Sequence, residues 1–153
     1  RAADEGRMTA NGEQRTANGE RHQLVSVLPS LFTPEGIARW QAHLNGSTVF
    51  AEAAAGWVGT LVLVASDLEP PAHTLVRVDD GRCTEARTAD VADLAHADFV
   101  LAATTTAWLA LIAGRTTPTM AAMTGRLHLE KGDLFALIPH AKAAAELLAA
   151  AAD

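Results

Sequence analysis

The sequence predicts an α+β domain, built from a single, mainly antiparallel five-stranded sheet that is covered by helices. Three observations lead to this expectation. An amphipathic helix with clear start and stop signals begins the apolar part of the chain. The middle of the chain contains alternating and β-branched runs, and the last third contains apolar helical segments separated by glycines. The 153 residues fit one domain and suffice to bury a core.

The first 23 residues differ in composition from the rest. They contain almost no large apolar side chains, and the polar five-mer TANGE occurs twice, at residues 9–13 and 16–20. Such a segment cannot bury enough apolar surface to fold. We therefore expect residues 1–23 to be a disordered polar tail and residues 24–153 to be the folded domain, with structure beginning within residues 24–32.

An amphipathic helix is expected over residues 33–46, TPEGIARWQAHLNG. Thr33 suits the N-cap, and Pro34 suits the first helical position, where a missing N–H is tolerated. Apolar side chains then recur with helical spacing on one face, and an Asn-Gly pair provides the stop signal.

The middle of the chain shows the alternation and the β-branched content that are typical of strands. These patterns predict four or five strands in succession, drawn from residues 47–57, 58–66, 73–78, 82–88 and 97–104. Asp80-Gly81 lies between two alternating runs, which is a strong signal for a hairpin turn. The aspartates nearby are interpreted as turn, cap and loop residues rather than as cation ligands.

Two apolar helices follow in the last third. The first ends at Gly114, and the second begins at Pro118 and ends at Gly125. A short strand is then expected over residues 126–130, with Leu127 and Leu129 on one face and polar side chains, including an outward-facing histidine, on the other.

The end of the chain is expected to be helical. Lys131-Gly132 turns the chain, and Asp133 suits the N-cap of a further helix. Pro139 cannot continue that helix cleanly, so a kink or a fresh start is expected there. The alanine-rich segment over residues 142–152 is helical by propensity.

The polar residues show no catalytic pattern. No nucleophile elbow, zinc-protease helix, phosphate-binding loop or calcium loop is present. The six histidines are scattered, and Cys83 is the single cysteine, which excludes an internal disulfide and a multi-cysteine metal site. We interpret Cys83 as a small strand residue, with a reactive thiol as the alternative. We expect no catalytic residue, no metal and no cofactor.

The composition of the chain argues against nucleic acids and membranes as binding partners. The formal net charge is −6 with no basic face, so nucleic-acid binding is not expected. No apolar run approaches the ~18 residues of a membrane span, and no stable membrane insertion is expected. The first residues lack the apolar core of a signal peptide, which leads us to expect a cytoplasmic protein.

Apolar side chains crowd the last third, and ordinary core packing is the simplest explanation for them. Two methionines, Met120 and Met123, on one short helix between glycines favour an adaptable apolar site instead. Loosely joined helices can stand off a sheet and leave a cavity.

The run ADFVLAATTTAWLALIAGRTTPTMAAMTGRLHLEKGDLFALIPHAKAAAELL, residues 97–148, resembles the sterol carrier protein type 2 family. The matching features are a strand through residues 98–101, a Thr-capped helix, a Pro-started helix, and a short strand between Gly125 and Gly132 that leads into the last helix. The resemblance covers roughly residues 46–150, although the double-proline loop at residues 67–73 departs from it.

The resemblance implies an α/β sandwich around an apolar tunnel that takes a sterol, a fatty acid or an acyl-CoA chain. It implies non-catalytic binding and transfer or presentation of that ligand by a monomer or weak dimer. The matching lining positions are Trp108, Leu111, Ile112, Met120, Met123, Leu134, Leu137 and Ile138.

Two other functions stay open at this point. An accessory or catalytic domain of lipid or steroid metabolism would show a hydrogen-bonded His or Asp pair inside the cavity. A dimerisation scaffold would show a filled core, with the alanine-rich helix as an interface.

Overall fold

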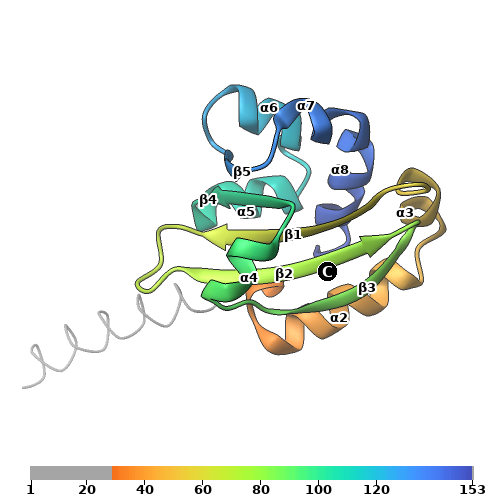
Figure 1. The fold of residues 1–153 in the computed structure, drawn as a ribbon, viewed down its shortest axis with the longest axis horizontal. Helices are drawn as coiled ribbons and strands as arrows, with labels where there is room; N and C mark the ends of the chain where they lie inside the picture. Colours follow the sequence, from red (N-terminus) through yellow and green to blue (C-terminus); the bar gives the residue numbers. More distant parts are fainter. Residues whose placement is uncertain (1–28, 153) are drawn as a thin grey trace, which may run out of the picture.

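The computed structural model describes residues 29–152, so the predicted tail and the start of the predicted domain lie outside the described residues. Figure 1 shows one twisted sheet with helices packed on it. The strand order is β3-β2-β1-β4-β5, with β1 and β4 parallel and the other neighbours antiparallel. The predicted fold class, α+β with a mostly antiparallel five-stranded sheet, is confirmed. The strands are β1 (Val58–Ala65), β2 (Ala72–Asp79), β3 (Arg82–Thr88), β4 (Phe99–Ala103) and β5 (His128–Lys131).

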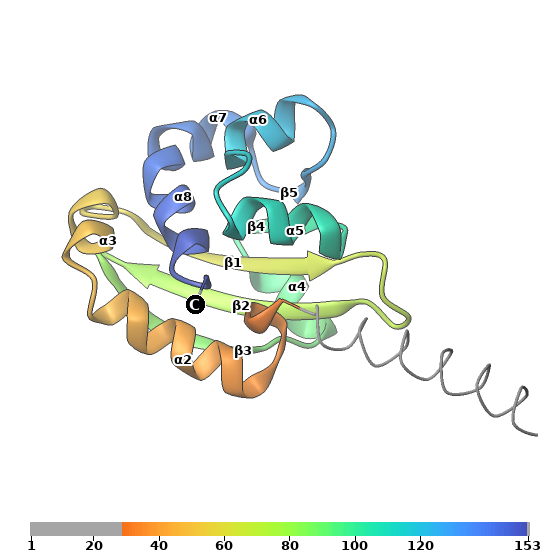
Figure 2. The same ribbon diagram turned by 180° about the vertical axis from the view of Figure 1, so that it is seen from behind.

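The helices cover the two faces of the sheet unequally. Helix α4 lies on one face, and α2, α5 and α8 lie on the other (Figures 1 and 2). The larger core contains side chains of β1, β2 and β4 together with α2, α3, α5 and α8, and a smaller core lies on the opposite side of the same strands. The helical elements are η1 (Ser30–Phe32), α2 (Pro34–Asn45), α3 (Thr48–Ala53), α4 (Val91–His96), α5 (Thr105–Ile112), α6 (Pro118–Met123), α7 (Leu134–Leu137), η2 (Ile138–His140) and α8 (Ala141–Ala149).

Helix α2 forms as predicted. The Thr33 hydroxyl accepts a hydrogen bond from the Gly36 N–H at 3.1 Å, and Pro34 is the first helical residue. Trp40 is buried, and its indole Nε1 donates to the Leu147 carbonyl at 2.7 Å. This hydrogen bond ties the first long helix to the last one, 107 residues further along the chain.

The β2–β3 hairpin also forms as predicted. Asp80 and Gly81 have φ angles of 50° and 88°, the positive values that a type I′ turn requires at both central residues. The Asp80 carboxylate accepts a hydrogen bond from the Gly56 N–H at 2.7 Å. It therefore acts as a turn residue that joins the hairpin to the segment before β1.

Two segments differ from the sequence predictions. The strand expected over residues 47–57 is wrong, because these residues form α3, with the Ser47 hydroxyl accepting from the Phe50 N–H at 3.1 Å. Alanine and glutamate after Phe50 are strong helix formers, and together with the cap they outweigh the alternation around Val49. Helix α4 was not predicted from the sequence. Asp90 and Asp93 are among the aspartates interpreted as cap and loop residues, and they form a reciprocal capping box at the start of this helix.

In the last third of the chain, the helices end at the glycines that were predicted to stop them. Helices α5 and α6 end before Gly114 and Gly125, which have φ angles of 78° and 80°. Asp133 caps α7, and the chain passes through η2 at Pro139 before α8 begins. These residues therefore form several short pieces rather than one long helix.

Thr74 on β2 is a fully buried polar residue, and its hydroxyl donates to the Leu31 carbonyl at 2.6 Å. Replacing it, Thr74→Val, keeps the side-chain shape but leaves that buried carbonyl without this donor. We predict a loss of about 1–2 kcal/mol in the free energy of unfolding, measured by urea denaturation. Thr88→Val is the control, because Thr88 pairs with Thr74 across the strands but is exposed. Equal losses in the two variants would contradict the prediction.

Candidate functional site

Two small apolar cavities lie side by side between the sheet and the helices of the last third. The outer cavity has a volume of about 30 Å³ and the inner cavity about 20 Å³. They share five wall residues: Leu101, Pro118, Leu127, Leu137 and Ala144. The outer cavity is completed by Thr119, Ala122, Leu129, Leu134, Ile138 and Ala141, and the inner cavity by Leu61, Leu63, Trp108, Leu147 and Leu148.

Strand alternation and small helix residues create this space. Leu101 of β4 pairs with Leu129 of β5, so both place side chains at the floor of the outer cavity. On the helix side, Ala141 and Ala144 are spaced three residues apart on α8, and Ala122 faces them from α6. Alanine at these three positions leaves part of the space unfilled, because each of them contributes only a methyl group to the wall.

Trp108 fixes the inner end of the site. Its indole Nε1 donates to the Val64 carbonyl of β1 at 2.9 Å, and its ring meets the Phe32 ring edge-on at a centroid distance of 5.9 Å. The buried indole N–H therefore has its partner, and α5 is held against the centre of the sheet.

The outer cavity opens beneath an exposed apolar surface on α6, α7 and η2. Helices α6 and α7 lie next to each other in both views of the ribbon (Figures 1 and 2), and η2 follows α7 directly in the chain. We call this surface the apolar cap. Its exposed fractions are Met120 53%, Met123 75%, Leu134 37%, Phe135 79% and Ile138 45%. Leu134 and Ile138 belong to both the cap and the cavity wall, so the apolar surface is continuous from solvent to the interior.

The structure separates the sequence-predicted lining residues into three groups. Leu134, Leu137 and Ile138 line the outer cavity, and Trp108 and Leu137 line the inner cavity. Leu111 and Ile112 are buried on α5 but border neither cavity. Met120 and Met123 are exposed on the apolar cap.

Sequence reasoning missed the sheet side of the site and its small residues. Leu61, Leu63 and Leu101 were recognisable only as strand residues, because their common face becomes a cavity wall once the helices have packed. Ala122, Ala141 and Ala144 carry no chemical signal of their own.

The tunnel implied by the resemblance is not open in the described residues. A cavity needs about 10–15 Å³ to hold one water molecule, so voids of about 30 and 20 Å³ cannot hold a lipid chain. A larger ligand can enter only if the surrounding helices move.

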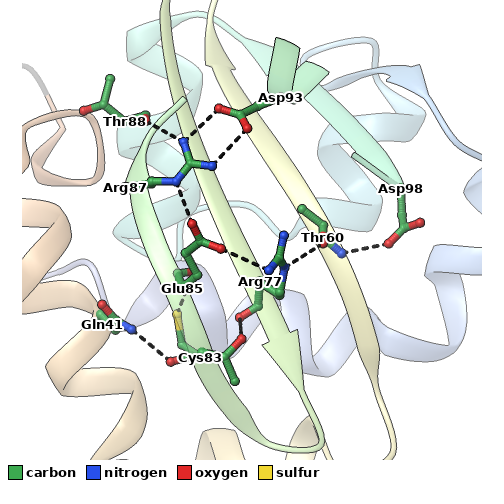
Figure 3. A network of polar contacts seen from close by, with 10 residues as sticks. Gln41, Thr60, Arg77, Cys83, Glu85, Arg87, Thr88, Asp93 and Asp98 are labelled. Carbon is green, nitrogen blue, oxygen red and sulfur yellow. Dashed lines mark hydrogen bonds and ion pairs between the residues drawn. The ribbon is translucent and has the colours of Figure 1, made fainter. Parts of the chain in front are cut away.

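The main charged network lies elsewhere, on the outer strands (Figure 3). The Arg87 guanidinium contacts the Glu85 carboxylate at 2.6 Å and the Asp93 carboxylate at 2.8 Å, and Arg77 contacts Glu85 at 3.1 Å. Hydrogen bonds from Arg87 hold the pKa of the Asp93 carboxyl well below its usual range. The network joins α4 to β3, and it borders neither apolar cavity.

Cys83 lies on the inner side of this network and is buried on β3. Its backbone N–H donates to the Asn45 side chain at 2.9 Å, and its carbonyl accepts from Gln41 at 3.1 Å. Burial raises the pKa of the Cys83 thiol to about 11. The residue therefore helps to join α2 to the hairpin and is protonated at neutral pH.

The described residues contain no group of three or more His, Cys, Asp or Glu side chains that could hold a metal ion. Among the helices of residues 29–152, none has both the length and the apolar character needed to cross a bilayer.

The geometry defines a class of protein: a mixed five-stranded sheet with an apolar cavity under short helices. The sequence model of the SCP-2 sterol transfer family matches residues 42–138. A crystal structure of sterol carrier protein 2 is 31% identical, with a TM-score of 0.70, over 78% of this chain and 95% of that chain. The chain belongs to the SCP-2 sterol transfer family.

Two further structures are similar. A conserved hypothetical protein from Thermus thermophilus, described as possibly a sterol carrier protein, is 32% identical with a TM-score of 0.67, over 78% of this chain and 86% of that chain. The apo form of sterol carrier protein 2 from Yarrowia lipolytica shares the fold, with 17% identity and a TM-score of 0.51 over 78% of this chain and 96% of that chain. A comparison with curated proteins found no match.

The burial of Cys83 generates a prediction about its reactivity. Iodoacetamide at pH 7.5 should leave the native protein unlabelled over an hour, because alkylation requires a thiolate and access to it. The same protein in guanidinium chloride should be labelled completely, as intact-mass measurement will show. Rapid labelling of the native protein would mean that the thiol is reactive rather than structural.

Proposed function

We propose that this protein binds a hydrophobic ligand, a sterol, a fatty acid or an acyl-CoA chain, between its sheet and helices α6 to α8, and that it transfers or presents that ligand without chemical change. The observation that supports this proposal most directly is the continuity between the apolar cap and the two cavities. Membership in the SCP-2 sterol transfer family supports lipid binding and transfer as the general function.

The ligand enters by displacing the short helices. Gly114, Gly125 and Gly132 flank α6 and β5 with positive φ angles, and α6 and α7 contain six and four residues. Short pieces joined by glycine can shift as units, since few backbone hydrogen bonds and little packing hold each of them. Such a shift merges the outer and inner cavities into one apolar channel.

The eight lining positions have different roles in this proposal. Met120 and Met123 on the apolar cap meet the ligand first, and methionine adapts to ligands of different shape. Leu134, Leu137 and Ile138 form the channel wall. Leu111 and Ile112 hold α5 in the same buried core as Trp108, and Trp108 closes the inner end.

Apolar burial alone gives enough affinity. Each buried methylene contributes about 0.8 kcal/mol, so ten of them contribute roughly 8 kcal/mol before the costs of ordering. Before those costs are subtracted, this sum corresponds to a dissociation constant of about one micromolar, and the burial of further methylenes offsets the costs. Among the described residues, Thr119 is the one polar side chain lining the two cavities, which supports binding rather than catalysis.

Native mass spectrometry of the freshly purified full chain tests the function, followed by organic extraction of any bound material. We expect a co-purified fatty acid, sterol or acyl-CoA, or uptake of an added fluorescent fatty acid. A clean apo mass without any such uptake would contradict lipid binding.

Filling the cavities should abolish most of the binding. Ala144 lines both cavities, and Ala144→Leu places three more carbon atoms where the ligand would lie. We predict that affinity for a fluorescent fatty acid falls about tenfold, because burial of roughly two methylenes is lost. The matched control is Ala149→Leu, since Ala149 is exposed at the end of the same helix. Unchanged affinity in a folded Ala144→Leu variant would place the ligand elsewhere.

A charge on the apolar cap should slow entry without unfolding the protein. Met120 is 53% exposed, so Met120→Glu keeps its carboxylate in water and should leave the melting temperature within a few degrees of the wild type. The rate of ligand uptake from vesicles, measured by stopped-flow fluorescence, should fall several-fold. Val91→Glu is the control, because Val91 is exposed on α4, on the other face of the sheet. Equal rates in the two variants would exclude the cap as the entrance.

A further inference from the structure

A second pocket lies at the edge of the sheet where β1 and β4 end. These strands are parallel neighbours, so their carboxyl ends meet at the same edge, and the chain then turns toward β2 after one and into α5 after the other. Ser66, which follows β1, and Thr104, which follows β4, both line a pocket at this edge. This polar pocket has a volume of about 360 Å³. Its lining residues are Ser66, Ala103, Thr104, Thr106, Ala107, Ala110, Gly125, Arg126 and His128.

Alternation along the segment that contains β5 separates this pocket from the apolar site. Leu127 and Leu129 face the outer cavity, whereas Arg126 and His128 line the polar pocket. One short segment therefore presents an apolar side to one site and a cationic side to the other.

The side chains that line the polar pocket include the Arg126 guanidinium and three hydroxyl groups, and none of them is a carboxylate. Among the described residues, the Arg126 side chain forms no ion pair, and the hydroxyls of Ser66 and Thr106 form no hydrogen bond within the protein. The Thr104 hydroxyl accepts from the Ala107 N–H at 3.2 Å and keeps its own proton to donate.

Asp67 follows Ser66 in the sequence, and its carboxylate is turned to Thr105 rather than to a side chain of the pocket. Its two carboxylate oxygens accept from the Thr105 N–H at 2.9 Å and from the Thr105 hydroxyl at 3.0 Å. Asp67 does not line the pocket. A guanidinium and three hydroxyl groups in one lining without a carboxylate make this pocket suited to an anion.

We propose that the pocket between α5 and β5 binds a carboxylate or phosphate group, with Arg126 as its ion-pair partner and the hydroxyls of Ser66, Thr104 and Thr106 as hydrogen-bond donors. The anion has two possible sources. It is either a free phosphorylated or carboxylated metabolite, or the acidic headgroup of a lipid whose chain lies across β5 in the apolar cavities. The headgroup source rests on the proposed lipid-binding function, whereas the anion site itself does not.

The first experiment titrates the full-length protein with inorganic phosphate and with acetate, following the Thr106 and His128 signals by heteronuclear NMR. Arg126→Gln should weaken the binding about tenfold, because a charge-assisted hydrogen bond is lost. The control is Arg115→Gln, since Arg115 is an exposed arginine after α5 that does not line the pocket. Both exposed variants should keep the wild-type melting temperature.

A second experiment distinguishes the two sources by comparing oleate with oleyl alcohol, which has the same chain without the charge. If the anion is a lipid headgroup, Arg126→Gln weakens oleate binding, phosphate competes with oleate, and binding of the alcohol is unchanged. If the anion is a free metabolite, Arg126→Gln weakens phosphate binding alone. Both results support the anion site.

The proposal is overturned if neither phosphate, acetate nor oleate binding depends on Arg126. That outcome differs from a failure of the lipid-binding function, in which oleyl alcohol also fails to bind. Equal weakening by Arg115→Gln and Arg126→Gln would likewise overturn it, because it would indicate a general effect of surface charge.

Discussion

The parallel pairing of β1 with β4 is the constraint on which the rest of the structure depends. It places β4 beside the central strand rather than after β3, so the chain must cross one face of the sheet through α4 before it returns. After β4, β5 joins the sheet as its edge strand and the long helices α5 and α8 pack on the opposite face, where Trp108 donates to the Val64 carbonyl of β1. The apolar cavities lie between that returning segment and the sheet, and the polar pocket lies where the two parallel strands end.

The fold combines a hydrogen-bonded frame with a loosely built site. Buried contacts with defined partners hold the frame, such as Trp40 to Leu147 and Thr74 to Leu31. The site, in contrast, is covered by short helices between glycines, and three alanines contribute only methyl groups to its wall. This division suits the proposed binding of a hydrophobic ligand, because short covering elements can move while the sheet keeps its shape.

Local signals allowed much of the fold to be predicted from the sequence. The Thr33 cap, the Asp80-Gly81 turn and the glycine stops depend on neighbouring residues alone, and all were found where expected. Long-range packing was not accessible in the same way. The continuous apolar runs of β1 and β4 indicate burial on both faces but do not say which strands pair or in which direction. Trp108 and Leu111 share one helix face, although only Trp108 reaches a cavity. For residues 47–57, a short alternation competed with helix propensity and capping, and the latter prevailed.

Hydrogen–deuterium exchange of the full-length protein, with and without saturating oleyl alcohol, tests most directly whether the ligand binds between the sheet and α6 to α8. We predict slower exchange across residues 118–149 when the ligand is present, because the filled channel holds the short helices in place. Exchange in the β2–β3 hairpin, residues 72–88, should not change. Protection confined to the hairpin, or none at all despite measured binding, would contradict the proposed binding site.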